Sequence, residues 1–141
     1  MLGEQRLWNR LKEKLKPSII GQRIESPQTG EGIPDVAYSG GGAHGWIELK
    51  FLHSWPKREK TKVRIEHLTP QQRNWIWIHG NAGGKAFLLL SINNREYFLF
   101  SWKIIHEIGE LDRGELQEAA LWSSQQGGWD DLKTILMIGD L

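Results

Sequence analysis

The spacing of apolar residues along the chain predicts one helix followed by several strands. In the first segment, apolar residues recur at the spacing of one helical face, which predicts an amphipathic helix over residues 2–15. These residues are Leu7, Trp8, Leu11 and Leu15. Further along, apolar stretches bounded by Gly, Pro and Asn residues predict strands. The predicted strands are 22–26, 34–38, 46–52, 85–92 and 96–100.

The signals at its start and end predict a second helix over residues 70–81. Thr69 is a suitable N-cap, Pro70 suits the first helical position, and Gln72 completes a capping box. Three more helices are predicted over residues 102–109, 113–122 and 130–138. The resulting order of elements predicts an α/β (α+β) fold with a mixed central sheet flanked by helices.

Length and composition indicate a single soluble-type domain. The chain has 141 residues, 39% of them hydrophobic and 25% charged, which is typical of one globular domain over residues 1–141. We expect a core over about 2–100 and a helical C-terminal extension over about 102–141. The chain has no cysteine, which excludes disulfides and thiolate metal sites. It also lacks an apolar run of about 20 residues, so no membrane partner is expected, and its charged first segment predicts no signal peptide.

Charge is distributed unevenly along the chain. Residues 1–103 contain 16 Lys and Arg against 9 Asp and Glu, whereas residues 104–141 contain 2 against 8. A basic body suggests a polyanionic partner, although a solvated surface of uneven sign would show the same pattern.

The chemistry of the chain centres on two predicted strands joined by a Gly-rich connection over residues 39–45. Because side chains alternate along a strand, Glu48 and Lys50 share one face of the second strand, and Asp35 begins the strand before it. Two carboxylates and an ammonium group would then meet on one sheet. Neighbouring carboxylates repel unless a cation lies between them, and Mg²⁺ commonly binds one or two carboxylates together with phosphate oxygens.

These residues give the chain a resemblance to the PD-(D/E)XK nuclease superfamily, whose core is an αβββαβ unit. The nearer likeness is to phage-type endonucleases close to the VRR-NUC and Holliday-junction-resolvase-like branch. It is carried by four segments: Arg23-Ile24-Glu25, Gly32-Ile33-Pro34-Asp35, Gly45-Trp46-Ile47-Glu48-Leu49-Lys50 and Leu68-Thr69-Pro70-Gln71-Gln72-Arg73.

The resemblance implies a Mg²⁺-dependent endonuclease that hydrolyses DNA phosphodiester bonds, with Mn²⁺ as a substitute. Asp35 and Glu48 would bind the metal, and Lys50 would assist the attacking water. The enzyme would nick DNA or cut branched DNA in a bacterial or phage-infected cytoplasm, and junction resolution would require a homodimer. The alternative is a non-catalytic nucleic-acid-binding module that retains the fold.

A further acidic residue often completes such a site, and the sequence offers two candidates. Glu4 falls within the apolar stripe of the first helix, while Glu25 lies on a strand near Asp35. The sequence does not decide between them. Gln72 matches a glutamine near the active site of related nucleases, but its capping-box role would also explain it.

Five cations follow the Glu48–Lys50 strand within eight residues and are predicted to contact DNA phosphates. They are Lys57, Arg58, Lys60, Lys62 and Arg64, with Arg73 as a weaker candidate. A solvated surface loop is the alternative explanation of this cluster.

Overall fold

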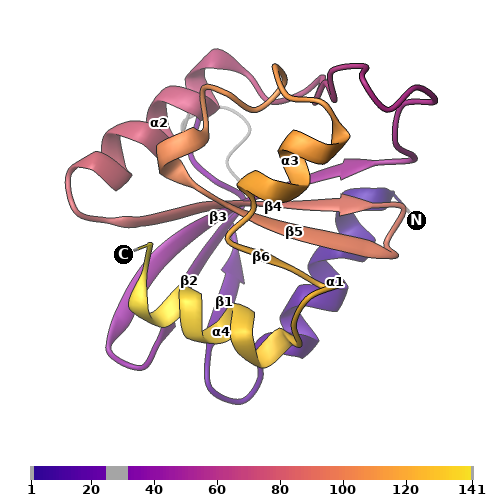
Figure 1. Ribbon diagram of the computed structural model, residues 1–141. Helices are drawn as coiled ribbons and strands as arrows, with labels where there is room; N and C mark the ends of the chain where they lie inside the picture. The colour runs from indigo at the N-terminus through magenta and orange to yellow at the C-terminus, as the bar shows by residue number, and fades with distance from the viewer. Residues whose placement is uncertain (1, 25–31, 141) are drawn as a thin grey trace.

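A six-stranded mixed sheet forms the centre of the molecule (Figure 1). The computed structural model describes residues 2–24 and 32–140. The strands, which lie in the order of the chain, are β1 (Ile20–Arg23), β2 (Val36–Gly40), β3 (Ala43–Leu52), β4 (Lys85–Ile92), β5 (Glu96–Ser101) and β6 (Trp122–Ser123). Neighbouring strands pair antiparallel, apart from β3 and β4, which are parallel.

Within residues 2–24 and 32–140, four α-helices and one 3₁₀ turn accompany the sheet. They are α1 (Gly3–Leu15), α2 (Pro70–Asn81), η1 (Trp102–Ile104), α3 (Arg113–Ala119) and α4 (Trp129–Ile138). The α2 helix provides the crossover between β3 and β4, because parallel neighbours need a long connection. Within the described ranges, no helix is long and apolar enough to cross a membrane.

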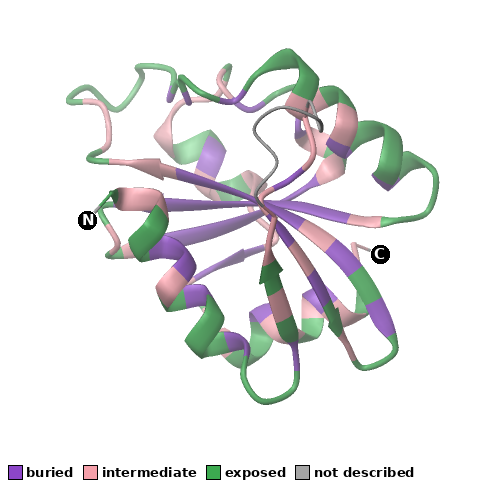
Figure 2. Cartoon of the chain, turned by 180° about the vertical axis from the view of Figure 1, so that it is seen from behind, coloured by how far each residue is buried: buried purple, intermediate pink, exposed green. Residues whose placement is uncertain are grey.

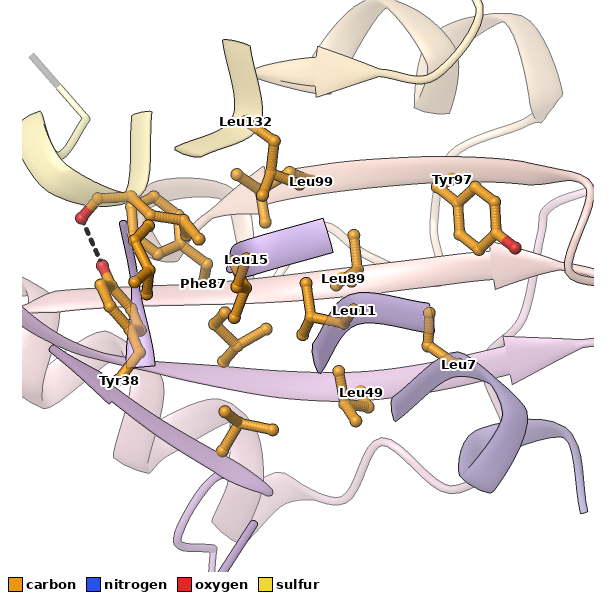
Figure 3. Close-up of a cluster of buried hydrophobic side chains, with 14 of the residues drawn as sticks. Leu7, Leu11, Leu15, Tyr38, Leu49, Phe87, Leu89, Tyr97, Leu99 and Leu132 are labelled. Carbon is orange, nitrogen blue, oxygen red and sulfur yellow. Dashed lines mark hydrogen bonds between the residues drawn. The ribbon is translucent and has the colours of Figure 1, made fainter. Parts of the chain in front are cut away.

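The helices bury both faces of the sheet, so the central strands are apolar on both sides (Figure 2). On one face, α1 and α4 pack against alternate residues of β2 to β5, among them Ile47, Leu49 and Leu89 (Figure 3). On the other face, α2, η1, α3 and the segment before α2 cover Leu88, Leu90 and their neighbours. The layers therefore follow the α/β pattern that the sequence predicts.

The predicted αβββαβ order is confirmed by α1, β1, β2, β3, α2 and β4, and the fold class is confirmed with it. The apolar stripe of α1 is buried as its spacing predicts. At the start of α2, the Thr69 hydroxyl accepts from the Gln72 backbone at 3.2 Å, and the Gln72 side chain accepts from the Thr69 backbone at 3.0 Å. The capping box is therefore complete.

The predictions for the C-terminal third were partly wrong. In place of a helix over residues 102–109 there is the short η1 and a series of turns. The Ile105 and Ile108 carbonyls accept hydrogen bonds from the Arg73 guanidinium at 2.7 and 2.6 Å, which gives them a partner on α2 instead of a helical one. Trp122, predicted as the end of a helix, lies in β6, and the first strand begins at Ile20 instead of Gln22.

The end of α4 is tied to the sheet by one buried hydrogen bond. Tyr38 on β2 is 3% exposed, and its hydroxyl donates to the Leu136 carbonyl at 2.6 Å (Figure 3). Carbonyls in the last turn of a helix have no partner within the helix, so this side chain satisfies one of them.

We therefore expect Tyr38→Phe to lower the free energy of unfolding by about 1–2 kcal/mol, since a buried acceptor loses its donor. Urea unfolding followed by circular dichroism measures the change. Tyr97→Phe is the matched control: its hydroxyl donates to the Asn94 carbonyl in a turn, and the loss should be smaller. If both variants lose the same free energy of unfolding, the Tyr38 hydrogen bond does not contribute specifically to holding α4 on the sheet.

Candidate active site

A pocket of about 540 Å³ brings together the residues that the sequence singled out. It is walled by the first turns of α1 and α2, the end of β1, the start of β2 and the second half of β3. Its polar side chains come from Glu4, Gln5, Arg23, Asp35, Glu48, Lys50, His67 and Gln72.

Strand register places the two central carboxylates beside each other. Val36 pairs with Ile47 across the β2–β3 hairpin, which sets Asp35 opposite Glu48. The Asp35 carboxylate also accepts a hydrogen bond from the Leu49 backbone N–H at 2.9 Å. That bond holds the Asp35 carboxylate against the backbone of β3. The position of this carboxylate is therefore fixed by the pairing of the two strands.

Glu48 and Lys50 form an ion pair inside the protein. The Lys50 ammonium lies 3.2 Å from Glu48 Oε2, and the two residues are only 4% and 1% exposed. The ammonium also donates to the His67 carbonyl at 2.8 Å. An ammonium has three N–H groups, so one remains for a further acceptor.

Electrostatics at Glu48 are unfavourable for its charged form. Burial raises the pKa of Glu48 to about 8, and the Asp35 carboxylate adds to the increase, while Lys50 opposes it. Glu48 Oε1 is buried and has no hydrogen-bond partner among the described residues. A buried carboxylate oxygen without a donor is costly unless a proton or a cation satisfies it.

Glu4 shares this environment from the first turn of α1. Burial raises the pKa of Glu4; the Lys50 charge opposes the increase, and Asp35 adds to it. Of the two candidates for a further acid, Glu4 lies in the pocket. Glu25 lies outside the described residues, and its predicted role stays a prediction.

The donor set suits a hard divalent cation. The carboxylates of Asp35 and Glu48, with Glu4 nearby, supply only oxygen ligands, which Mg²⁺ and Mn²⁺ prefer. Within residues 2–24 and 32–140, no three His, Asp or Glu side chains are grouped as a metal site in their own right. Mg²⁺ commonly binds one or two carboxylates and completes its shell with water or substrate. The carboxylates of Asp35 and Glu48, of which Glu48 Oε1 has no hydrogen-bond partner among the described residues, fit such an ion.

Gln72 both caps α2 and lines the pocket. Its position therefore allows both a capping role and a role in the active-site pocket. The capping bonds use its side-chain oxygen, and its predicted part in chemistry stays a prediction.

The predicted DNA-contacting loop, residues 57–64, is exposed except for Val63. Lys57, Arg58 and Lys60 have no carboxylate within 4.0 Å in the part of the chain that the structure describes, whereas Lys62 pairs with Glu110 at 2.8 Å. Arg64 is also exposed. Among the described residues, Arg64 likewise has no ion pair, so these four cations are more available to phosphates than Lys62.

Arg73 has a structural role that the sequence did not reveal. Its guanidinium is half-buried and donates to the carbonyls of Leu68, Ile105 and Ile108. These bonds join α2 to η1 and the following turns. A contact with nucleic acid would compete with them, and that part of the prediction stays untested.

Sequence reasoning missed other pocket residues because nothing in their local pattern distinguishes them. Arg23 accompanies Glu4 at the pocket wall, and its guanidinium donates to the Gln5 side chain at 3.3 Å. Phe51, two residues after Leu49 on β3, is half-buried and lines the pocket. His67 holds Lys50 through its carbonyl, and its position is set by the loop before α2.

Comparisons with known proteins give similarity at the level of structure, at low sequence identity. No protein-family model matches the chain, and no curated protein matches it. Among solved structures, the chain is similar to Hjc of Archaeoglobus fulgidus, a Holliday junction resolvase from an archaeal hyperthermophile. The identity is 17%, the TM-score is 0.49, and the similarity covers 72% of this chain and 74% of that one. At this distance it transfers no residue role, so the site rests on the geometry above.

The raised pKa of Glu48 predicts how stability depends on pH when divalent metal is removed. The folded protein keeps this proton up to about pH 8, whereas the unfolded chain releases it near 4.5, so the free energy of unfolding should fall as pH rises between these values. The fall is at most roughly 5 kcal/mol, at about 1.4 kcal/mol per pKa unit. Urea unfolding in EDTA at several pH values measures it.

Glu48→Gln should flatten this dependence and stabilise the protein at pH 8. Glu118→Gln, which neutralises an exposed carboxylate on α3, is the matched control and should keep the wild-type slope. A Glu48→Gln variant with an unchanged slope would show that Glu48 titrates normally in the folded protein.

Proposed function

We propose that the protein is a metal-dependent endonuclease that hydrolyses phosphodiester bonds of DNA, as a member of the PD-(D/E)XK superfamily. The observation that carries the proposal is the meeting of Asp35, Glu48 and Lys50 in one pocket, with a carboxylate oxygen of Glu48 left without a partner. The αβββαβ order of the fold supports it, because Glu48 and Lys50 lie on β3 and Asp35 directly precedes β2. The assignment to the phage-type branch of the superfamily rests on the sequence resemblance alone.

The pocket residues have distinct parts in this reaction. Asp35 and Glu48 would hold Mg²⁺, and Glu4 is close enough in the pocket to contribute through water. When bound, the ion polarises the phosphodiester and makes water a stronger nucleophile. Lys50 has one N–H free of protein partners among the described residues, with which it would orient the attacking water or stabilise negative charge on the phosphate.

The surroundings favour DNA over a small phosphate ester as the substrate. The loop that follows β3 carries exposed Lys57, Arg58 and Lys60, which have no ion pairs among the described residues. Such charges bind a polyanion whatever its sequence. A four-way junction has two strands to cut, so a junction-resolving enzyme would act as a homodimer, while a nicking enzyme needs one copy.

A non-catalytic DNA-binding module on the same fold is the second candidate. It would need the basic loop but not the buried Glu48–Lys50 pair. Burying two charges is costly, and apolar residues would fill the same space at equal or better stability. The intact pair therefore favours the enzyme.

We expect cleavage of DNA in Mg²⁺ or Mn²⁺ and none in EDTA, measured by gel electrophoresis of a panel of plasmid, linear, single-stranded and four-way-junction DNA. Asp35→Asn, Glu48→Gln and Lys50→Ala should each reduce the rate by at least about 100-fold, because each removes a group that stabilises the transition state. Glu118→Gln, far from the pocket on α3, should cleave like the wild type. Binding of the whole panel without cutting would favour the non-catalytic module.

Metal binding should also be visible without activity. Because a cation at Asp35 and Glu48 binds only the folded chain, saturating Mn²⁺ should raise the melting temperature by a few degrees in the wild type but not in Asp35→Asn. The increase should be larger at pH 8 than at pH 5.5, since the ion displaces the Glu48 proton. Equal increases in the two proteins would place the metal elsewhere.

A further inference from the structure

A second concave surface lies beside the candidate active site, between the outer side of α1 and the turn that joins β4 to β5. It encloses about 620 Å³. Four cations line it: Arg6, Arg10 and Lys14 from α1, and Arg95 from the turn. We call this surface the α1 groove.

The α1 groove holds its positive charge without compensation from nearby acids. In residues 2–24 and 32–140, none of its four cations has a carboxylate within 4.0 Å. Glu13, the acidic residue that lines the groove, pairs with Lys16 at 3.4 Å. The groove therefore offers a net positive field to solvent.

The spacing of the cations on α1 is unfavourable for the isolated helix. Arg6, Arg10 and Lys14 are four residues apart, so their side chains are neighbours on one face. Each like-charged pair at this spacing destabilises a helix by about 0.2–0.5 kcal/mol. A bound anion would convert this repulsion into attraction.

The α1 groove is continuous with the candidate active site. The Arg6 guanidinium lies 5.8 Å from the centre of the Phe51 ring, and Phe51 lines the active-site pocket. Glu4 belongs to the pocket and Arg10 to the groove, six residues further along the same helix, which is a rise of about 9 Å along the helix axis at 1.5 Å per residue.

The cations of the groove suit the regularly charged backbone of DNA. One strand of a duplex carries a charge about every 3.4 Å along the helix axis. Arginine suits such contacts because its planar fork donates two parallel hydrogen bonds to a phosphate. The basic loop over residues 57–64 follows the C-terminal end of β3, the end at which Phe51 lies.

We propose that the α1 groove binds the sugar-phosphate backbone of DNA to one side of the phosphate that is cut. This inference rests on the proposed nuclease function and specifies how its substrate is held. Backbone contacts carry no sequence information directly, so the groove contributes affinity and position without base preference.

The test compares two double variants with the same loss of charge. Arg10→Gln with Arg95→Gln removes two groove cations, whereas Lys12→Gln with Lys103→Gln removes two exposed cations outside it. Binding of fluorescein-labelled linear and four-way-junction DNA is measured in EDTA by fluorescence anisotropy over a salt series. The groove variant should bind DNA about tenfold more weakly at 0.1 M salt. The salt slope, which is the steepness with which the logarithm of the binding constant falls with the logarithm of salt concentration, should decrease by about 1.8, since each lost phosphate contact accounts for about 0.9. The control should stay close to wild type.

Hydrolysis of bis(p-nitrophenyl) phosphate in Mn²⁺ separates this inference from the proposed function. This small diester reaches only the pocket, so the groove variant should hydrolyse it at the wild-type rate while Glu48→Gln does not. A wild type that cleaves DNA together with a groove variant that keeps the wild-type salt slope overturns the groove alone. A wild type that neither binds nor cleaves DNA overturns both proposals. Loss of diester hydrolysis in a groove variant with a normal melting temperature would assign these cations to the pocket and overturn the groove.

Discussion

The rest of the structure is arranged around one buried ion pair, Glu48 with Lys50, in the middle of an otherwise apolar sheet. Removing two charges from water is costly, and their mutual attraction repays it only with good geometry and further hydrogen bonds. Here Lys50 has a second acceptor in the His67 carbonyl, whereas the Asp35 carboxylate across the hairpin disfavours the charged form of Glu48. The segment before α2 must therefore be in place for the pair to be tolerated.

The fold could be predicted where local pattern and tertiary packing agree. The apolar stripe of α1, the capping box at Thr69 and the continuous apolar run of β4 each have a direct physical reading, and each element forms where predicted. The prediction failed over residues 102–109 because the chain there finds its hydrogen-bond partners at a distance. The Arg73 guanidinium donates hydrogen bonds to two carbonyls that a helix would have satisfied internally. No periodicity in the sequence predicts these bonds.

The candidate site was predictable for a related reason. Alternation along β3 places Glu48 and Lys50 on one face, and a hairpin brings Asp35 to them, so three residues follow from local geometry alone. Arg23 and His67 reach the same pocket from other parts of the chain and carry no local signature. The α1 groove was missed because it combines one side of a helix with a turn some 80 residues later, and only the packed structure places them together.

The parallel pairing of β3 with β4 has a consequence for how the chain folds. Gly45 lies opposite Lys85, so this contact closes a loop of about 40 residues before it contributes any stabilisation. As the chain leaves the ribosome, α1 and the first three strands are available well before β4. Until β4 arrives, β3, which carries Glu48 and Lys50, is an open edge of the sheet. Such non-local closure is typical of slow folding.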